Sequence, residues 1–248
     1  MLTTSPRLRP DRRSVSTVTA VGVIIPAKDE STRIRAALES VIASCARVSA
    51  PCTIVVVDDA SSDDTAQIAS DALRSHHGRS TVITVDVGRA GSARRTGVDA
   101  FRSDVADPSS AWVLSTDADS VVPPYWVERF TQHHAEGALA VAGVVDLTDD
   151  GDGRRIADRW IADYRPTIAA DGSHPHVHAA NLGVRLDAYD EVGGFRDLDR
   201  IEDIELWDRL RSAGHLPVAD ASIVVSTSAR ADGRVDKGFA AALGRLYG

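Results

Sequence analysis

The sequence contains little sulfur, few aromatic residues and no long apolar run. Its 248 residues include two cysteines, Cys45 and Cys52, and one methionine, and 5% are aromatic. Two cysteines without a Cys/His cluster exclude a disulfide framework and a structural zinc site, so we interpret them as reduced thiols of a cytoplasmic protein. No stretch approaches the ~18 apolar residues of a membrane span, so we expect no transmembrane segment.

Positive charge is also scarce. Lys and Arg number 28 against 36 Asp and Glu, which gives a formal net charge of -8. Nucleic acid binding needs a basic face, so no nucleic acid partner is expected. A phosphate-bearing ligand would need a metal ion or individually placed arginines. The N-terminal arginines lack an apolar segment behind them, so we expect residues 1–19 to form a disordered tail and not a secretory signal.

Short apolar runs alternate with helical patterns along the chain. The runs predict strands at residues 21–26, 53–59, 81–87, 111–119, 138–147, within 174–185, and at 222–227. Helices are predicted from a cap at Ser31, from Asp63 and Asp64, and over residues 93–101, 125–136, 155–168 and 204–212. This alternation predicts an α/β fold: a single Rossmann-like domain with a mostly parallel central sheet flanked by helices.

Acidic residues follow three of the first four predicted strands. They are Asp29 with Glu30, Asp58 with Asp59, and Asp117 with Asp119. Ligands of parallel sheets bind beyond the carboxyl ends of the strands, so these acids are expected at one edge. In a strand, Asp117 and Asp119 point to the same side and suit one hard divalent cation. A helix cap or a solvated turn is the alternative.

Two further segments carry candidate residues. Gly91 to Gly97 (GSARRTG) lies between a strand and a helix, where Arg94 or Arg95 could pair with phosphate oxygens. Two solvated arginines in a surface loop are the alternative. Glu202 and Asp203 precede a helix, where acids are common for dipole reasons, but one of them could also act as a general base.

Three alternating histidines, His174, His176 and His178, would share a face in a strand. A zinc site is one interpretation, but no fourth ligand is evident. We favour histidines of a substrate loop or of the surface. The tryptophans are interpreted as core or cleft wall: Trp112, Trp126, Trp160 and Trp207.

Taken together, these segments resemble the family 2 glycosyltransferases with the GT-A fold. The motifs that carry the resemblance are residues 21–30, 55–65, 91–97, 115–124, 181–195 and 201–210. Their order and spacing are more specific than any one of them. The resemblance implies that Pro26, Ala27 and Glu30 line a nucleotide pocket. It also implies that Asp59 binds the base, supported by Asp58.

The same resemblance implies the residues of catalysis. Arg94 would approach the donor phosphates or the ribose. Asp119 would bind the metal, Mn²⁺ or Mg²⁺, while Asp117 would contact the metal or the ribose. Asp203 would be the catalytic base, and Glu202 would hydrogen-bond the acceptor or the donor sugar.

The resemblance also divides the domain, residues 20–248, into parts. A nucleotide-binding half (20–120) would precede an acceptor-binding half (121–228) and a mobile C-terminal segment (229–248). Asn181 and Gly183 would face the donor sugar or the acceptor. A third metal ligand, often a late His in this family, is missing around Thr227, unless His215 folds back. Membrane segments of polymerising members are also missing, which favours single transfers.

The expected activity is therefore metal-dependent, inverting transfer from a nucleotide-diphosphate sugar, with a UDP-sugar favoured, to an acceptor hydroxyl. Two alternatives stay open. One is a sugar-phosphate nucleotidyltransferase, although a glycine-rich basic loop after the first strand is missing. The other is a non-catalytic nucleotide-sugar-binding protein. The acceptor is unidentified, and a homo-oligomer is possible.

Overall fold

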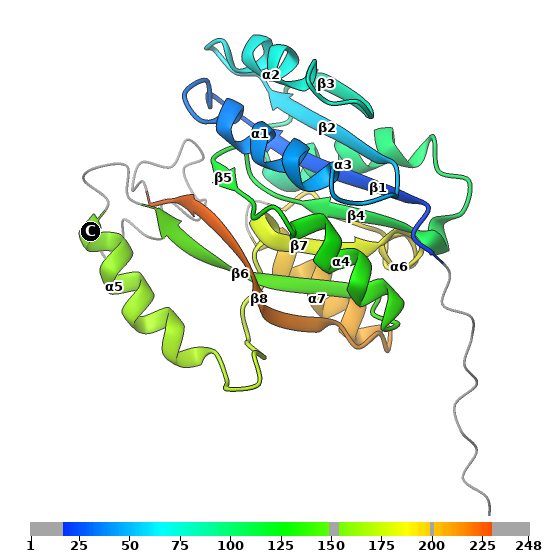
Figure 1. Ribbon diagram of the computed structural model, residues 1–248, viewed down its shortest axis with the longest axis vertical. Helices are drawn as coiled ribbons and strands as arrows, with labels where there is room; N and C mark the ends of the chain where they lie inside the picture. The colour runs from blue at the N-terminus through cyan, green and yellow to red at the C-terminus, as the bar shows by residue number, and fades with distance from the viewer. Residues whose placement is uncertain (1–16, 149–153, 199–200, 230–248) are drawn as a thin grey trace, which may run out of the picture.

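The computed structural model describes residues 17–148, 154–198 and 201–229. They form one eight-stranded sheet in the order β3-β2-β1-β4-β7-β6-β8-β5, with helices on both faces (Figure 1). The strands are β1 (Ala20–Ala27), β2 (Cys52–Asp59), β3 (Arg79–Val85), β4 (Ala111–Ser115), β5 (Ser120–Val121), β6 (Ala140–Thr148), β7 (Leu182–Arg185) and β8 (Val218–Ser228).

The helices connect these strands and cover the sheet. They are α1 (Ile34–Cys45), α2 (Thr65–Leu73), α3 (Ala90–Arg102), α4 (Trp126–Ala135), α5 (Arg154–Tyr164), α6 (Leu186–Glu191) and α7 (Glu202–Ser212), with short 3-10 turns at Pro108–Ser110, Arg165–Thr167 and Ala179–Asn181. Within the described ranges, no helix combines the length and apolarity needed to cross a bilayer.

Two strands of this sheet, β5 and β7, run opposite to the other six. β1 pairs in parallel with β2 and β4, and β2 pairs in parallel with β3. β7 is antiparallel to both of its neighbours, β4 and β6, so β6 again runs in the direction of β4. β8 is parallel to β6. The predicted α/β fold is confirmed, and most strands end at one edge of the sheet.

The core lies on both faces of the sheet because the central strands β1, β2 and β4 are mostly apolar. In β1, Val21, Val23 and Ile25 pack toward α1, α2 and α4. Ile24 points to the opposite face and packs with residues of α3, α6 and α7. Successive side chains of a strand alternate between faces, so a continuous apolar run fills both layers.

Several predicted boundaries differ from the structure. Ser31 does not cap α1, because the helix begins at Ile34 and the Ser31 N–H donates to Asp63 Oδ2 at 3.2 Å. Gly91 lies in the first turn of α3 and not in a loop. A Cβ at this position would come 2.6 Å from the Arg196 carbonyl oxygen, so the close packing requires glycine. β4 ends at Ser115, four residues before the predicted end.

The predicted disordered tail is too long at its C-terminal end. Val18 is buried, and the Thr19 N–H donates to the Ser110 carbonyl at 2.8 Å. Ordered structure therefore begins before residue 19. The rest of the predicted tail, and the predicted mobile segment beyond residue 229, lie outside the described residues.

Asn181 holds the second half of the sheet together from inside. Its Oδ1 accepts a hydrogen bond from Trp126 Nε1 at 2.9 Å. Its Nδ2 donates to the carbonyls of Val144 and Ile223, at 2.8 and 2.9 Å. The residue has no exposed surface, and a Cβ on Gly143 would collide with its amide group. One side chain therefore joins α4, β6 and β8.

We expect Asn181→Ala to lower the free energy of unfolding by about 3 kcal/mol, because it leaves the Trp126 indole N–H and two carbonyls buried without partners. Urea denaturation measures this change. The control is Gln132→Ala on the exposed surface of α4, which should shift stability by less than about 0.5 kcal/mol. Equal stability of the two variants would contradict a structural role for Asn181.

Candidate active site

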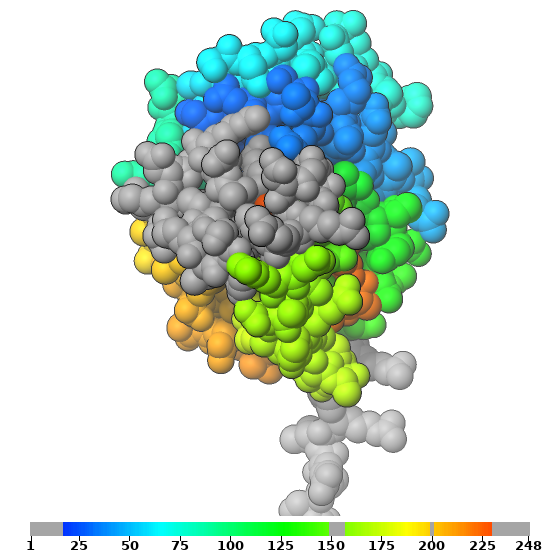
Figure 2. Space-filling model, turned by 90° about the vertical axis from the view of Figure 1, so that its left-hand side faces the viewer, coloured from blue at the N-terminus to red at the C-terminus, as the bar shows by residue number. Residues whose placement is uncertain are grey.

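The acids predicted at the strand ends meet at one edge of the sheet. Ala27, the last residue of β1, pairs with Asp58 of β2, and Ile24 pairs with Ser115 at the end of β4. In Figure 1 the carboxyl ends of β2 and β6 point to the left, and Figure 2 views the molecule from that side. There the N-terminal half lies above α5 and α7.

The loops after β1 and β2 are joined by reciprocal hydrogen bonds. Asp29 Oδ1 accepts from the Ser62 N–H at 2.6 Å and from its hydroxyl at 2.9 Å. The Asp29 N–H donates to Ser61 Oγ at 2.9 Å, and the Glu30 N–H donates to Thr65 Oγ1 at 2.7 Å. These contacts fix the loop in which a nucleotide pocket is predicted, and they leave Glu30 buried.

The two acids at the end of β2 differ in their surroundings. Asp59 Oδ1 accepts from the N–H groups of Val87 and Gly88, at 2.7 and 3.1 Å, and so fixes the loop after β3. Asp58 Oδ1 is buried and has no hydrogen-bond partner within the described part of the chain. The unsatisfied acceptor at this strand end is therefore on Asp58, whereas one oxygen of Asp59 is already used.

Arg94 lies beneath the edge and links its two sides. Its Nη2 donates to Asp117 Oδ1 at 2.5 Å, and its Nη1 donates to Glu202 Oε1 at 2.6 Å. Its Nε donates to Ser115 Oγ at 3.0 Å, and the guanidinium carbon lies 5.9 Å from the centre of the Phe195 ring. Only 3% of the residue is exposed. The structure thus engages Arg94 with protein groups instead of presenting it to solvent.

Arg94 keeps its charge in this buried place. Burial alone would lower its pKa, but the charges of Asp117, Glu202 and Asp203 raise the pKa above its ordinary value. An opposite charge within contact distance favours the charged form, and here three acids outweigh desolvation. A buried cation therefore draws the acids of α7 and of the turn after β4 together.

Asp203 lies in the first turn of α7, beside Glu202. Its Oδ2 accepts from the Ala179 N–H at 2.8 Å, and its Oδ1 accepts from the Ile204 N–H at 2.8 Å. Burial and the neighbouring charge of Glu202 raise the pKa of Asp203 above that of an ordinary aspartate. A carboxylate with a raised pKa is a stronger base, and the two N–H groups fix its orientation.

Asp117 and Asp119 lie in the turn after β4 and are both half-buried. Because β4 ends at Ser115, the strand geometry assumed from the sequence does not apply to them. Thr227 Oγ1 lies 3.4 Å from Asp119 Oδ1. Among the described residues, no three acidic, His or Cys side chains form a metal site. Two carboxylates still fit Mg²⁺ or Mn²⁺, which take further oxygens from phosphates and water.

Three predicted residues are not brought to this edge. Asn181 and Gly183 lie in the core, where a Cβ on Gly183 would collide with the Phe130 ring. Both residues are enclosed by the protein core, so neither lies at the edge where a sugar was predicted to bind. His215 follows the C-terminal end of α7, an eleven-residue helix, with Nε2 3.2 Å from Glu191 Oε2. An eleven-residue helix is about 16 Å long, so His215 lies about that far from the first turn of α7 and does not fold back toward Asp119.

Other residues take part that sequence reasoning missed. Ser115 holds Arg94, and Thr227, which contacts Asp119, also bonds Ser120 Oγ at 2.9 Å. Ser115 lies two residues before Asp117 in the sequence, and this proximity was the one local indication that it belongs to the site. Pro26 and Ala27 do lie at the end of β1, half-buried and buried.

The family model described as Glycosyl transferase family 2 matches residues 22–193. The chain belongs to glycosyl transferase family 2. It is therefore a glycosyltransferase, and membership of family 2 favours glycosyl transfer over both a nucleotidyltransferase and a non-catalytic binding protein.

Similar curated proteins are undecaprenyl-phosphate 4-deoxy-4-formamido-L-arabinose transferases. The one from Pectobacterium carotovorum subsp. carotovorum is 28% identical over 141 residues, which cover 57% of this chain and 41% of the relative. The one from Serratia proteamaculans is 31% identical over 150 residues, covering 59% and 43%. The family 2 chain thus spans less than half the length of these relatives.

Solved structures share the fold. The mannosyltransferase PcManGT from Pyrobaculum calidifontis, in complex with GDP-Man and Mn²⁺, has a TM-score of 0.64 at 19% identity, over 86% of this chain and 57% of that chain. TarS from S. aureus, in complex with UDP-GlcNAc, has a TM-score of 0.61 at 16% identity, over 87% and 60%. Both comparisons confirm the GT-A fold.

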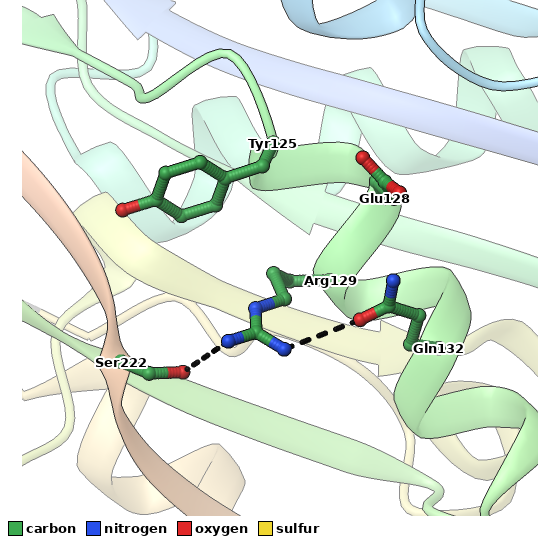
Figure 3. A pocket seen from close by; sticks show the side chains of 5 residues that line it. All are labelled: Tyr125, Glu128, Arg129, Gln132 and Ser222. Carbon is green, nitrogen blue, oxygen red and sulfur yellow. Dashed lines mark hydrogen bonds between the residues drawn. The ribbon is translucent and has the colours of Figure 1, made fainter.

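A hollow of about 330 Å³ lies between α4 and β8 (Figure 3). Its lining consists of Tyr125, Glu128, Arg129, Gln132 and Ser222. Arg129 spans it, donating to Ser222 Oγ and to Gln132 Oε1, both at 3.3 Å. No residue predicted for donor binding or catalysis lines it, so its residues supply matched controls.

We expect Arg94→Ala to lower the free energy of unfolding by about 3 kcal/mol, because removing one partner leaves buried acids uncompensated. Arg95→Ala is the matched control, since that neighbouring arginine is exposed, and it should cost less than about 1 kcal/mol. Urea denaturation at neutral pH compares the two. Similar losses in both variants would show that the bridge contributes no special stability.

Proposed function

We propose that this glycosyltransferase moves a sugar from a nucleotide-diphosphate sugar, in the first place a UDP-sugar, to an acceptor hydroxyl with inversion at the anomeric carbon. The observation that carries the proposal is the bridge made by Arg94. It joins Asp117, beside the predicted donor site, to Glu202, beside the predicted base, with charge-assisted hydrogen bonds of 2.5 and 2.6 Å.

On the donor side, the joined loops after β1 and β2 form the nucleoside pocket. Asp58, with its unsatisfied buried oxygen, accepts a hydrogen bond from the base or ribose, and Asp59 orders the neighbouring loop. Asp119 and Asp117 would hold Mg²⁺ or Mn²⁺, and among the described residues no third acidic, His or Cys side chain joins them. When bound, the cation neutralises charge that develops on the departing nucleoside diphosphate.

Arg94 is a positioning residue in this proposal. Its Nε donates to Ser115, its Nη2 to Asp117 and its Nη1 to Glu202. Arg94 therefore acts on the donor through Asp117. The sequence-based role, direct contact with donor phosphates, would require these hydrogen bonds to break. Keeping the acids close without repulsion is the simpler use of a buried cation.

On the acceptor side, Asp203 removes the proton from the attacking hydroxyl. The oxygen forms a bond to the anomeric carbon on the face opposite the diphosphate, and the bond to the diphosphate oxygen breaks. The proton ends on Asp203 and the electron pair on the departing diphosphate. The Ala179 and Ile204 N–H groups hold the carboxylate in place during this transfer.

The names of the relatives favour a second acceptor class, a lipid phosphate. A phosphate oxygen is already deprotonated at neutral pH, so it needs no general base. Asp203 therefore separates the two classes: transfer to a hydroxyl requires it, and transfer to a phosphate does not.

We expect Asp203→Asn to lower transfer to hydroxyl acceptors, water included, by about 10²–10⁴-fold while donor affinity changes little. Release of UDP from UDP-sugars measures transfer, and calorimetric titration measures donor binding. In the wild-type protein, activity is lost as pH falls through the raised pKa of Asp203, because only the charged form accepts a proton. Wild-type rates in the variant would remove Asp203 from the mechanism and favour the phosphate acceptor.

We expect UDP to raise the melting temperature in the presence of Mn²⁺ or Mg²⁺, by mass action, and EDTA to abolish the shift. Asp119→Asn should remove most of the metal-dependent part. Asp208→Asn, a charge-matched change on the exposed face of α7, should leave it intact. A UDP-induced shift that is the same with EDTA would argue against a metal at Asp119.

A further inference from the structure

Three consecutive backbone N–H groups of the loop after β1 donate to side chains of the loop after β2. The hydrogen bonds run from the N–H groups of Asp29, Glu30 and Ser31 to Ser61 Oγ, Thr65 Oγ1 and Asp63 Oδ2, at 2.9, 2.7 and 3.2 Å. Side chains of the second loop therefore set the path of the first loop, residue by residue.

The Asp29 carboxylate makes the return contact from the first loop to the second. Its Oδ1 accepts from the Ser62 N–H at 2.6 Å and from the Ser62 hydroxyl at 2.9 Å. Hydrogen bonds to an ionised carboxylate are stronger than those between neutral groups, and two of them fix both the backbone and the side chain of the donor residue. Asp29 thereby holds the chain three residues after the end of β2.

Both loops contain a residue other than glycine with positive φ. The value is 52° at Asp29 and 53° at Ala60. Aspartate adopts this left-handed conformation more readily than most residues, whereas alanine keeps it only where the surroundings enforce it. Ala60 lies between the end of β2 and Ser62, so the hydrogen bonds from Ser62 to Asp29 supply part of that restraint.

The restrained turn follows directly on the buried acid of the proposed nucleoside pocket. Asp58 pairs in the sheet with Ala27, so the two strands end side by side, two residues before Ala60 and Asp29. Asp58 is 3% exposed, and its Oδ1 accepts no hydrogen bond from the described part of the chain. The backbone that follows Asp58 fixes the direction of this side chain, so the turn held by Asp29 sets where the unsatisfied oxygen points.

We propose that Asp29 is a positioning residue for nucleotide binding. Through Ser62 it holds the turn after β2 in the conformation in which Asp58 accepts a hydrogen bond from the base or the ribose. The inference rests on the proposed function, because the nucleoside pocket is part of it. Asp29 acts here as a hydrogen-bond acceptor, so an amide oxygen at the same place replaces it. A side chain without an acceptor leaves the turn without this restraint.

Three substitutions of Asp29 separate the acceptor from the backbone conformation. Asp29→Asn keeps an acceptor oxygen and a residue that tolerates positive φ, and Asp29→Gly keeps only the tolerance. Asp29→Ala keeps neither. Asp64→Ala is the matched control, because Asp64 is an exposed acid of the same segment whose side chain does not cap α2.

The test is calorimetric titration of the full chain with UDP and with GDP, in the presence of Mg²⁺. We expect Asp29→Gly and Asp29→Ala to weaken nucleotide binding by about tenfold or more, Asp29→Asn by less than about threefold, and Asp64→Ala not at all. In nucleotide release from UDP- and GDP-sugars, Asp29→Gly should raise KM and change kcat little, because it removes binding that the ground and transition states share. The melting temperature without nucleotide checks that each variant is folded.

Wild-type affinity in Asp29→Gly would overturn the inference, and so would equal losses in Asp29→Asn and Asp29→Gly. A loss confined to Asp29→Ala would assign the effect to backbone strain and overturn it as well. A wild-type protein that binds neither nucleotide overturns the inference together with the proposed donor site. A wild-type protein that binds a nucleotide but releases none from the nucleotide sugars loses the proposed transfer, and the titrations then still decide the role of Asp29.

Discussion

The buried charge of Arg94 is the interaction on which the arrangement of the site depends. Asp117 and Glu202 are 85 positions apart in the chain, and the repulsion between their like charges would otherwise separate them. A guanidinium offers donors in a fixed fork, so it can hold two carboxylates and a hydroxyl at once. Ser115, on β4, fixes the third side. The bridge therefore sets the distance between the predicted donor site and the predicted base.

The loops at the same edge are held in a conformation that the chain does not favour by itself. Among the described residues, positive φ outside glycine occurs at Asp29, Ala60 and Ile201, with values of 52°, 53° and 59°. Such backbone costs of order 1–3 kcal/mol and persists only when its surroundings enforce it. Asp29 and Ala60 lie in the joined loops after β1 and β2, and Ile201 immediately precedes α7. The strain is thus concentrated around the site.

The two sides of the edge differ in chemistry. The predicted donor side gathers acids around a buried cation, which suits a metal and a diphosphate. The side formed by β6, α5 and the segment before β7 contains the stacked rings of Trp160, Tyr164 and His176. Asn181 lies in the core, where it fixes Trp126 of α4 and the carbonyls of Val144 and Ile223.

The sequence by itself determined the strands, the order of the elements and the place of the acids. Continuous apolar runs have one way to be buried in a parallel sheet, and parallel strands bring their carboxyl ends to one edge. Only the tertiary structure decided the partners. Arg94 meets Glu202 across 108 positions, Asn181 turns into the core, and His215 stays at the far end of α7. Local periodicity reports which face a residue occupies, but pairing between distant segments depends on how the whole sheet is packed.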